Sequence, residues 1–516
     1  MSQDRLRNLV FLLSCTFVIL GSIYLCFSIW PAEDAMILFR YVRNLAESGI
    51  ISYNGNSYQA VEGSTDFLWM ICLSTFHFLN LPIYLSALLL SFIGMALAWV
   101  QLRKTFPSKD KVWMWGVMAI VLAPQWWAGI QGFSVLWFTG LICWFFSSVL
   151  REKPWEVALA SLCCCLTRPD AVVFVLPLLG FLAFKQEKRA KYYLPILFGF
   201  VLPGALYFAW RWNYFQAFLP LPFYVKGMQE KDLGLFSSAS VIYLLIYLIR
   251  YVGLLILPVS MKARKWKPQS WAFFLGGVLI PSLFYMTVVL EQNVAHRFVM
   301  PILLAVLFLF LMNWEQMKRP IWWMAIYLLL SSGYSFTYFV RTLPLQYDQI
   351  AHLGQELSRY PGKLATTEAG KIPFYSDWET LDLWGLNSPE LSLQLPDSAI
   401  LSSFEPDLIY LDDETAVSLL IQQIDSPYRK QKEWDNMVFN SLKYGIETGS
   451  YSYYWIPVQE DKSNWSVWDK GLFSSISNSY TNKEDLILLN NSFSYFDEVE
   501  RLILMHRGRK ATKLYP

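Results

Sequence analysis

The sequence predicts a polytopic α-helical membrane protein with an α+β domain after its last span. Of the 516 residues, 55% are hydrophobic and only 16% are charged, whereas a soluble domain usually carries about 25% charged residues. Charge also divides the chain, because residues 1–340 hold 26 Lys and Arg against 15 Asp and Glu, while residues 341–516 hold 16 against 25. The composition excludes a disordered chain and an ordinary cytosolic enzyme, and residues 341–516 are expected to form a separate domain in water.

Eleven apolar segments are expected to cross the membrane, because each approaches the roughly 20 residues that a spanning helix needs. The first covers residues 8–30, and no small-residue cleavage site follows it, so it is predicted to be an anchor and not a signal peptide. The other ten lie near residues 82–102, 113–130, 131–150, 155–168, 171–185, 192–210, 237–258, 270–290, 297–314 and 320–340.

The distribution of basic residues predicts the orientation of these spans. Six clusters hold 18 Lys and Arg, and cytoplasmic loops carry the excess of such residues. All six clusters fall on one side if residues 67–80 form an interfacial helix, which places the N-terminus in the cytoplasm and residues 341–516 outside. The alternative is that residues 67–80 span the membrane, which would put the cluster Arg103–Lys111 outside.

Residues 341–516 show the pattern of an α+β fold. ILSSFEPDLIYLDD is typical of a strand followed by an acidic turn, and YSYYWIPV is β-rich and aromatic. The region is acidic, so phosphate backbones would repel it and no nucleic-acid partner is expected. All seven cysteines precede this region, so no disulfide framework is expected in it.

The first outer loop, residues 31–66, carries the strongest chemical signal. Glu33 and Asp34 begin a predicted amphipathic helix whose polar face includes Arg40 and Asn44. An acidic pair stabilises a helix N-terminus through the helix dipole, which would explain one carboxylate or both. The alternative is that one carboxylate takes a proton from a hydroxyl group as a general base.

Further polar residues are predicted to face the same side of the membrane. They are Arg168 and Asp170 between two short apolar helices, Tyr224 and Lys226 after a Pro-rich loop, and His296 and Arg297 before a span. Arg, Lys and His side chains around one cavity can hold a phosphate group. A single His or Arg at a span end is more often an interfacial residue that snorkels. Arg250 lies inside a span, where lipid-phosphate binding and snorkelling are both open.

These polar residues lie in segments that match a known family. The stretch EDAMILFRYVRNLAESGIISYNGNSYQAVEGSTDFLW resembles the first outer loop of GT-C glycosyltransferases of the mycobacterial terminal arabinofuranosyltransferase type. The shared features are the acidic pair, an R-x-x-R-N helix at Arg40–Asn44, a turn from Gly49 to Asn54, and a V-E-x-x-T segment at Val61–Thr65. LTRPDAVV, LPLPFYVK, HRFVMPIL and TTEAGKIPFYSDWETLDLWGLNSPEL also resemble that superfamily. The chain departs from it with Glu33 in place of Asp and with Gln131 where relatives often have Glu.

The resemblance implies a GT-C protein of the bacterial inner membrane, with a transmembrane catalytic domain over residues 1–340 and a periplasmic domain over residues 341–516. It implies inverting transfer of a sugar, with arabinofuranose as a candidate, from a polyprenyl-phosphate donor to a glycan, a lipid-linked glycan or a protein. It places the general base at Asp34, supported by Glu33. The donor phosphate is assigned to Arg168, Tyr224, Lys226, His296 and Arg297, and substrate binding or loop support to Arg40, Asn44, Glu62, Thr65 and Asp170.

No cofactor is expected, because a monophosphate donor has no pyrophosphate for a metal to neutralise. A divalent cation at Glu33 and Asp34 is the alternative, since paired carboxylates suit hard cations. Two other function classes stay open. A transporter or flippase of lipid-linked sugars would show discontinuous helices in two related halves, and the sequence shows no such symmetry. A noncatalytic envelope protein would bind glycan through aromatic residues such as Trp384 and Trp455, for which core packing is the favoured explanation.

Overall fold

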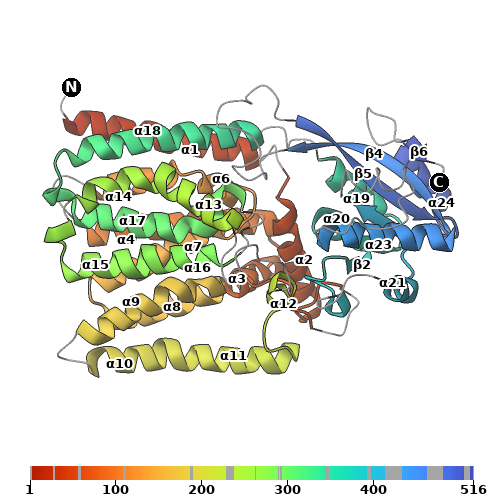
Figure 1. The fold of residues 1–516 in the computed structure, drawn as a ribbon, viewed down its shortest axis with the longest axis horizontal. Coiled ribbons are helices and arrows are strands. Elements are labelled where there is room, and N and C mark those ends of the chain that lie inside the picture. Colours follow the sequence, from red (N-terminus) through yellow and green to blue (C-terminus); the bar gives the residue numbers. More distant parts are fainter. Residues whose placement is uncertain are drawn as a thin grey trace.

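The computed structural model has two parts, which Figure 1 shows side by side. The helical region (residues 3–342) is a bundle of roughly parallel helices. The sheet region (residues 348–514) contains a six-stranded sheet with helices packed on it. The structure describes residues 3–26, 30–55, 60–107, 112–185, 190–227, 238–261, 263–288, 290, 293–342, 348–391, 397–412, 433–461, 480–504 and 512–514.

The bundle helices form where the sequence is apolar over many residues, because a helix satisfies its own backbone hydrogen bonds in hydrocarbon. They are α1 (Gln3–Cys26), α4 (Ile83–Thr105), α5 (Val112–Val121), α6 (Gln125–Ile130), α7 (Val135–Leu150), α8 (Pro154–Thr167), α9 (Val172–Lys185), α10 (Ala190–Ile196), α11 (Leu202–Phe215), α13 (Ser238–Tyr247), α14 (Gly253–Ser260), α15 (Pro268–Phe274), α16 (Ile280–Met286), α17 (Met300–Met312) and α18 (Pro320–Thr342). Three π-helical turns, η2 (Leu197–Val201), η3 (Leu248–Val252) and η5 (Leu275–Leu279), join α10 to α11, α13 to α14 and α15 to α16.

In the described part of the chain, five helices are long and apolar enough to cross a membrane. They are Ile83–Thr105, Lys191–Phe215, Ser240–Ser260, Pro268–Met286 and Val294–Met312. Each of the eleven predicted spans contains a helix, but the eleven crossings stay a prediction. Residues 113–130 differ from the single span expected, because α5 ends at Val121 and α6 begins at Gln125. Pro124 lies at the break, and proline lacks the N–H that a continuing helix requires.

Three further helices of the helical region lie at its boundary with the sheet region (Figure 1). The first, α2 (Glu33–Ser48), is amphipathic and ends where Gly49, with φ of 74°, donates its N–H to the carbonyl of Leu45. Its neighbour α3 (Phe67–Phe78) has 12 residues and a length of about 18 Å, shorter than the ~30 Å hydrocarbon core. It therefore has the size expected of an interfacial helix. The third is α12 (Leu221–Gly227).

The sheet has the strand order β2-β1-β3-β5-β4-β6. The strands β1 (Lys363–Thr366), β2 (Glu379–Asp382) and β3 (Leu408–Leu411) are parallel. The remaining strands, β5 (Tyr480–Asn490), β4 (Tyr451–Asp461) and β6 (Thr512–Leu514), pair antiparallel. The helices of this region are α19 (Gln349–Leu357), α20 (Lys371–Ser376), α21 (Ser398–Phe404), α23 (Glu433–Thr448) and α24 (Phe496–Leu504).

Both faces of the sheet are covered, because successive strand residues point to opposite sides. Ala365 and Ile409 pack with apolar residues of α21 and α23 on one face. Leu364 and Leu408 pack with residues of α19 and α24 on the other. Two buried faces explain why the central strand β3 has the sequence Leu-Ile-Tyr-Leu, with all four residues buried. The carboxyl ends of β1 and β2 are held in fixed positions by this packing, and both lead into the site described next.

Candidate active site

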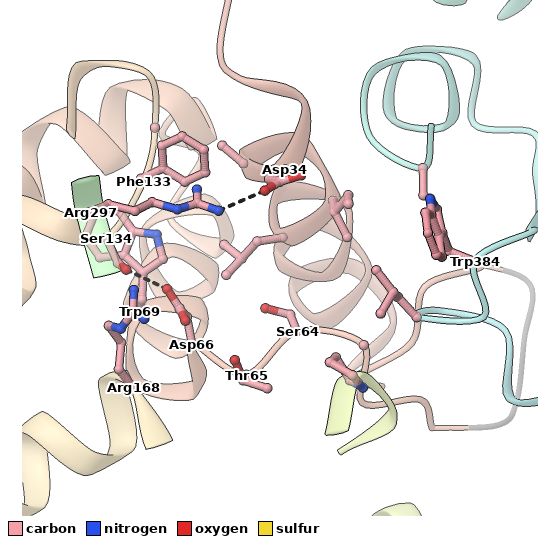
Figure 2. Close-up of a pocket in the computed structure, with 18 of the residues that line it drawn as sticks. Asp34, Ser64, Thr65, Asp66, Trp69, Phe133, Ser134, Arg168, Arg297 and Trp384 are labelled. Carbon is pink, nitrogen blue, oxygen red and sulfur yellow. Dashed lines mark hydrogen bonds and ion pairs between the residues drawn. The ribbon is translucent and has the colours of Figure 1, made fainter. Parts of the chain in front are cut away.

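A cavity of about 310 Å³ lies where α2 meets both regions. Its helical-region wall comes from α2, the loop before α3, the turn between α6 and α7, and the segments around Arg168 and Arg297. Its other wall comes from residues 367–386 of the sheet region. Figure 2 shows Asp34 between the walls, with Arg168 and Arg297 on one side and Trp384 on the other. The structure thus brings Asp34, Thr65, Arg168 and Arg297 to one cavity.

Asp34 and Arg297 form an ion pair in this cavity (Figure 2). Arg297 Nη2 donates to Asp34 Oδ2 at 2.8 Å, and the two side chains are 9% and 33% exposed. The guanidinium lies 3.8 Å from the ring centroid of Phe133, and an aromatic face attracts a cation. The ring and the acid therefore hold the arginine in place, while a third of the Asp34 side chain stays accessible.

A strained turn presents Arg297 to the cavity. Ala295 and His296 have φ of 51° and 60°, a left-handed conformation that costs a non-glycine residue on the order of 1–3 kcal/mol. Asn293 closes the turn, because its carbonyl accepts the His296 N–H and its side-chain oxygen accepts the Phe298 N–H, both at 3.0 Å. Such strain persists only where the surrounding contacts fix it, and here it fixes the arginine.

The same turn directs His296 away from the phosphate site expected for it. The imidazole is buried, with Nδ1 2.6 Å from the Tyr243 hydroxyl and Nε2 3.2 Å from the Tyr334 hydroxyl. Its ring lies among five tyrosine rings, those of Tyr243, Tyr247, Tyr251, Tyr334 and Tyr338. The two left-handed residues point His296 and Arg297 in different directions. His296 therefore supports the turn and does not line the cavity.

Arg168 lines the cavity, and Asp170 sets its orientation. Arg168 donates from Nε and Nη2 to the two Asp170 oxygens at 3.0 and 2.9 Å, and the Tyr285 hydroxyl donates to Asp170 at 2.7 Å. The guanidinium also lies 4.8 Å from the ring centroid of Phe298. A bidentate pair uses only part of the donors of a guanidinium, so the remaining N–H groups suit an anion. Asp170 acts on the site through Arg168.

Asp66 is a second cavity carboxylate, which sequence analysis did not single out. Ser134 Oγ donates to its Oδ2 at 2.5 Å (Figure 2). Burial raises the pKa of Asp66, and Arg168, Ser134 and Arg297 oppose that rise. The signal was present, because Asp66 directly follows the V-E-x-x-T segment. Ser134 gave none, since one serine in an apolar stretch has no distinctive pattern.

Glu33 joins the two regions instead of facing the cavity with Asp34. Its Oε1 accepts the N–H groups of Gly370 at 2.5 Å and Lys371 at 3.0 Å, where α20 begins. A Cβ on Gly370 would lie 2.1 Å from the Glu33 carbonyl oxygen, so only glycine fits there. Burial raises the pKa of Glu33 to about 7, and Lys371 opposes the rise. Glu33 was expected to support Asp34 at the same site. In the structure the two side chains face different directions, because adjacent residues of a helix point about 100° apart.

Arg40 and Asn44 also hold the two regions and the outer loop together. Arg40 is 1% exposed and donates to the carbonyls of Tyr53 and Trp378, both at 2.7 Å, and to the side chains of Asn54 and Thr380. Asn44 Nδ2 donates to the carbonyls of Ser52 and Tyr53 at 3.0 and 2.9 Å. We call Glu33, Arg40, Asn44 and these partners the clasp. Its polar groups bind protein groups, so Arg40 and Asn44 support the loop and do not reach the cavity.

The other expected ligands lie near α12. Arg211 Nε donates to Glu62 Oε1 at 2.8 Å, and Nη2 contacts Oε2, so Glu62 supports the loop through a buried ion pair. The Tyr224 hydroxyl accepts the N–H of Leu219 at 3.2 Å, whereas Pro222 and Val225 of the same helix line the cavity. The side chain of Lys226 lies outside the described residues, so its predicted role in phosphate binding stays a prediction.

The sheet-region wall is the part of the site that sequence analysis did not assemble. Thr367, Glu368, Ala369, Asp382, Trp384 and Leu386 form it. Trp384 appeared in the sequence as one aromatic residue among many. Trp384 lies two residues after the end of β2, and Glu368 lies two residues after the end of the neighbouring strand β1. This shared position is the signal that would have identified Trp384. That signal requires the strand pairing, which the sequence does not show.

Glu33 and Asp34, the acidic pair at the start of α2, have different partners. Glu33 binds backbone N–H groups, and Asp34 binds Arg297, whereas a divalent cation needs several oxygens around one point. Among the described residues, no group of three or more His, Cys, Asp and Glu side chains could hold a metal ion.

Known proteins resemble this chain in two ways. Residues 341–458 match a family model described as a domain of unknown function, DUF8728, and no curated protein matches the sequence. The crystal structure of ArnT from Cupriavidus metallidurans in the apo state has a TM-score of 0.55 at 12% identity, covering 84% of this chain and 97% of that one. The same protein bound to undecaprenyl phosphate gives 0.54 at 12% identity, with 82% and 96% covered. The chain therefore has the fold of ArnT.

Proposed function

We propose that this chain is an integral-membrane glycosyltransferase of the inverting type, which moves a sugar from a polyprenyl-phosphate donor to an acceptor outside the membrane. The observation that carries the proposal is the Asp34–Arg297 ion pair in a cavity between a bundle of apolar helices and a sheet region. The ArnT structure bound to undecaprenyl phosphate supports a polyprenyl-phosphate partner, and ArnT is itself a GT-C glycosyltransferase.

The donor phosphate binds beside Arg168 and Arg297 in this proposal. A guanidinium group can donate two parallel hydrogen bonds to phosphate oxygens. Asp170 orients Arg168, and Phe133 supports Arg297, so both cations are already in position. The apolar helices allow the long polyprenyl chain to stay in the bilayer while the sugar phosphate reaches the cavity.

Asp34 is the general base. When the donor phosphate binds Arg297, the carboxylate is released to accept the proton of the acceptor hydroxyl. The acceptor oxygen then bonds to the anomeric carbon as the bond between that carbon and the phosphate oxygen breaks. The lipid leaves as polyprenyl phosphate, whose charge the arginines stabilise. Attack from the face opposite the phosphate inverts the anomeric configuration.

The proposal includes a location and a first sugar to test. The six basic clusters support a cytoplasmic N-terminus with the sheet region on the opposite side of the membrane. The bacterial inner membrane is proposed from the family resemblance. Arabinofuranose is the first donor sugar to test, because the outer loop resembles that of the terminal arabinofuranosyltransferases.

The test is sugar transfer by the purified full chain in lipid nanodiscs, with synthetic polyprenyl-phosphate arabinofuranose and other polyprenyl-phosphate sugars as donors. Asp34→Asn should lower the rate by about 10²- to 10⁴-fold, the usual contribution of a general base. Its melting temperature should stay close to that of the unmodified chain, because Asp34 is partly exposed.

Asp66→Asn is the matched variant, since it neutralises the second carboxylate of the same cavity. It should slow transfer less than Asp34→Asn, because Asp66 is held by Ser134 on the helical-region wall. If Asp66→Asn abolishes transfer and Asp34→Asn does not, the base assignment is wrong. Full activity of both variants would contradict the proposed function itself.

A further inference from the structure

The sheet-region wall of the cavity is built at the carboxyl ends of two neighbouring parallel strands. Thr367 and Glu368 follow β1, and Trp384 follows β2. In open sheets with parallel strands, ligands bind in the crevice beyond these ends. This wall is therefore placed where the sheet region can hold a ligand of its own.

The loop that carries Trp384 is fixed from both regions. Asp382 accepts the N–H of Trp384 at 3.0 Å, and the N–H and side-chain amide of Asn387 at 2.9 and 2.8 Å. Gly385, with φ of 73°, permits the tight turn between them. The Tyr41 hydroxyl of α2 donates to Asn387 Oδ1 at 2.9 Å. The loop is thus preorganised, which lowers the entropy cost of binding.

Contact between the two regions is close at this loop. The Gly63 N–H donates to the Tyr41 hydroxyl at 3.0 Å. A Cβ on Gly63 would lie 2.1 Å from Asn387 Oδ1 and 2.5 Å from the Leu386 carbonyl oxygen. The Trp384 loop therefore rests directly on the segment that leads to Thr65 and Asp66. This contact sets the spacing between the two walls of the cavity.

The two walls differ in chemistry. One wall carries the guanidinium groups of Arg168 and Arg297 with Asp66 beside them, and the other is lined by Trp384, Glu368 and Asp382. Figure 2 shows Asp34 between Arg297 and Trp384. The guanidinium groups of the first wall attract a phosphate, whereas the second wall has acidic residues and no basic residue among those that line the cavity. The donor phosphate and the acceptor therefore separate onto opposite walls, and the acceptor hydroxyl comes to lie near Asp34.

An indole beside a carboxylate suits a sugar ring. The ring of tryptophan provides a broad apolar surface with a polar edge, which matches the C–H face of a sugar. A carboxylate accepts hydrogen bonds from the hydroxyl groups around that ring. An extended peptide or an acyl chain offers no such combination of a flat apolar face and several hydroxyl donors.

We propose that Trp384 and Glu368 form the acceptor subsite and that the acceptor is a sugar unit of a glycan. The inference rests on the proposed function, since it names the acceptor of that reaction. Trp384 stacks on the acceptor ring and Glu368 binds its hydroxyl groups, so that one hydroxyl of the same sugar faces Asp34. Both residues position the acceptor and leave donor binding to the other wall.

The kinetic test uses octyl arabinofuranoside, octyl galactofuranoside and octyl mannoside as acceptors, and a threonine-rich peptide as the protein acceptor. Trp384→Ala and Glu368→Gln should raise KM for the glycosides by roughly tenfold or more, equivalent to about 1.4 kcal/mol of binding. KM for the donor should not change, because the donor phosphate is assigned to the other wall. Trp384→Phe should restore most of the affinity for the acceptor, because it keeps an aromatic face.

The control is Tyr495→Ala, which removes an exposed aromatic ring of the sheet region that contacts Tyr360 and Phe493. It should leave both KM values unchanged. Unchanged acceptor KM in Trp384→Ala, or activity with the peptide alone, would overturn the inference.

A binding measurement separates this inference from the proposed function. Calorimetry with octyl arabinofuranoside is carried out on Asp34→Asn and on Asp34→Asn/Trp384→Ala, in nanodiscs, with no turnover required. Weaker binding by the double variant supports the subsite even if Asp34 proves not to be the base. Equal binding by the two variants overturns the subsite and leaves the base assignment to its own test.

Discussion

The cavity and the clasp both place acidic and basic side chains of α2 against distant parts of the chain, yet they leave those side chains in different states. In the cavity, Asp34 has one arginine partner and is 33% exposed. In the clasp, Arg40 donates to four protein groups and is 1% exposed. A buried charge with most of its donors bound to protein groups stabilises the fold, whereas a partly exposed charge beside a cavity can act on a ligand. The number of partners, and not the residue type, distinguishes the cavity from the clasp.

The largest expected effect concerns the cavity. Arg297→Gln should lower kcat by about 10²- to 10³-fold, because a donor aimed at developing negative charge is usually worth that much. The free energy of unfolding should change by less than about 1 kcal/mol, because the Asp34 carboxylate that loses its partner is partly solvated. The measurements are steady-state transfer and the melting temperature of the same sample.

Arg359→Gln is the control for this charge change, because Arg359 forms an exposed ion pair with Glu356. It should alter neither rate nor stability measurably. A large loss of stability in Arg297→Gln would mean that Arg297 has a structural role like that of Arg40. The distinction between the cavity and the clasp would then be wrong.

The opposite result is expected in the clasp. Arg40→Met should destabilise the chain by roughly 3 kcal/mol, because it leaves the buried carbonyls of Tyr53 and Trp378 without a donor. The folded fraction should keep a near-normal KM for the donor, since Arg40 does not line the cavity. Denaturation in detergent, followed by tryptophan fluorescence, measures the loss.

Arg43→Met provides the comparison on the same helix. Arg43 donates to the backbone carbonyl of Phe374 and forms an ion pair with Asp377, whose side chain is 66% exposed. An exposed pair contributes about 0–1 kcal/mol, so this variant should be close to normal. Equal losses in Arg40→Met and Arg43→Met would argue that burial does not control the strength of the clasp.

Sequence analysis predicted the parts of the site that depend on local patterns. Asp34 follows the first apolar run, and Arg168 and Arg297 interrupt apolar segments where charge is costly, so each is visible in one stretch of sequence. The amphipathic pattern of α2 likewise gives its buried face. The polytopic helical architecture follows from the length of the apolar runs.

The remaining features depend on contacts between distant segments. Glu33 differs from Asp34 only because Gly370, 337 positions later, offers its N–H. His296 differs from Arg297 because a two-residue left-handed turn separates their directions. Trp384 becomes part of the site only when β2 pairs with β1. No pattern in a single sequence encodes these three-dimensional relationships.

The pH dependence of the clasp provides a third test. Burial raises the pKa of Glu33 to about 7 in the folded chain from 4.5, so the protonated form favours folding. The stabilisation is complete below pH 4.5 and is lost as pH rises through about 7. Glu33→Gln lacks this titration, so at pH 8 it should be more stable than the unmodified chain by up to roughly 3 kcal/mol, a difference that disappears below about pH 4.5.

Unfolding at several pH values measures this difference, and Glu47→Gln is the control. Glu47 lies near the other end of α2, and its side chain is 63% exposed, so its substitution should give a curve parallel to that of the unmodified chain. A Glu33→Gln curve that is also parallel would mean that Glu33 does not change protonation between these pH values in the folded chain.

The smallest effect is expected at Tyr243, which contacts the strained turn before Arg297. Tyr243→Phe removes the hydroxyl that lies 2.6 Å from His296 Nδ1 and accepts from Asn293 Nδ2 at 2.9 Å. The strained turn then loses part of what fixes it, at a cost of about 0.5–1.5 kcal/mol. Because the turn positions Arg297, KM for the donor should rise by roughly threefold to tenfold.

Tyr192→Phe is the matched control, since the Tyr192 hydroxyl is buried and has no hydrogen-bond partner among the described residues. If both variants bind the donor equally well, the turn is held by its backbone contacts alone, and the tyrosine cluster belongs with the structural contacts of the clasp.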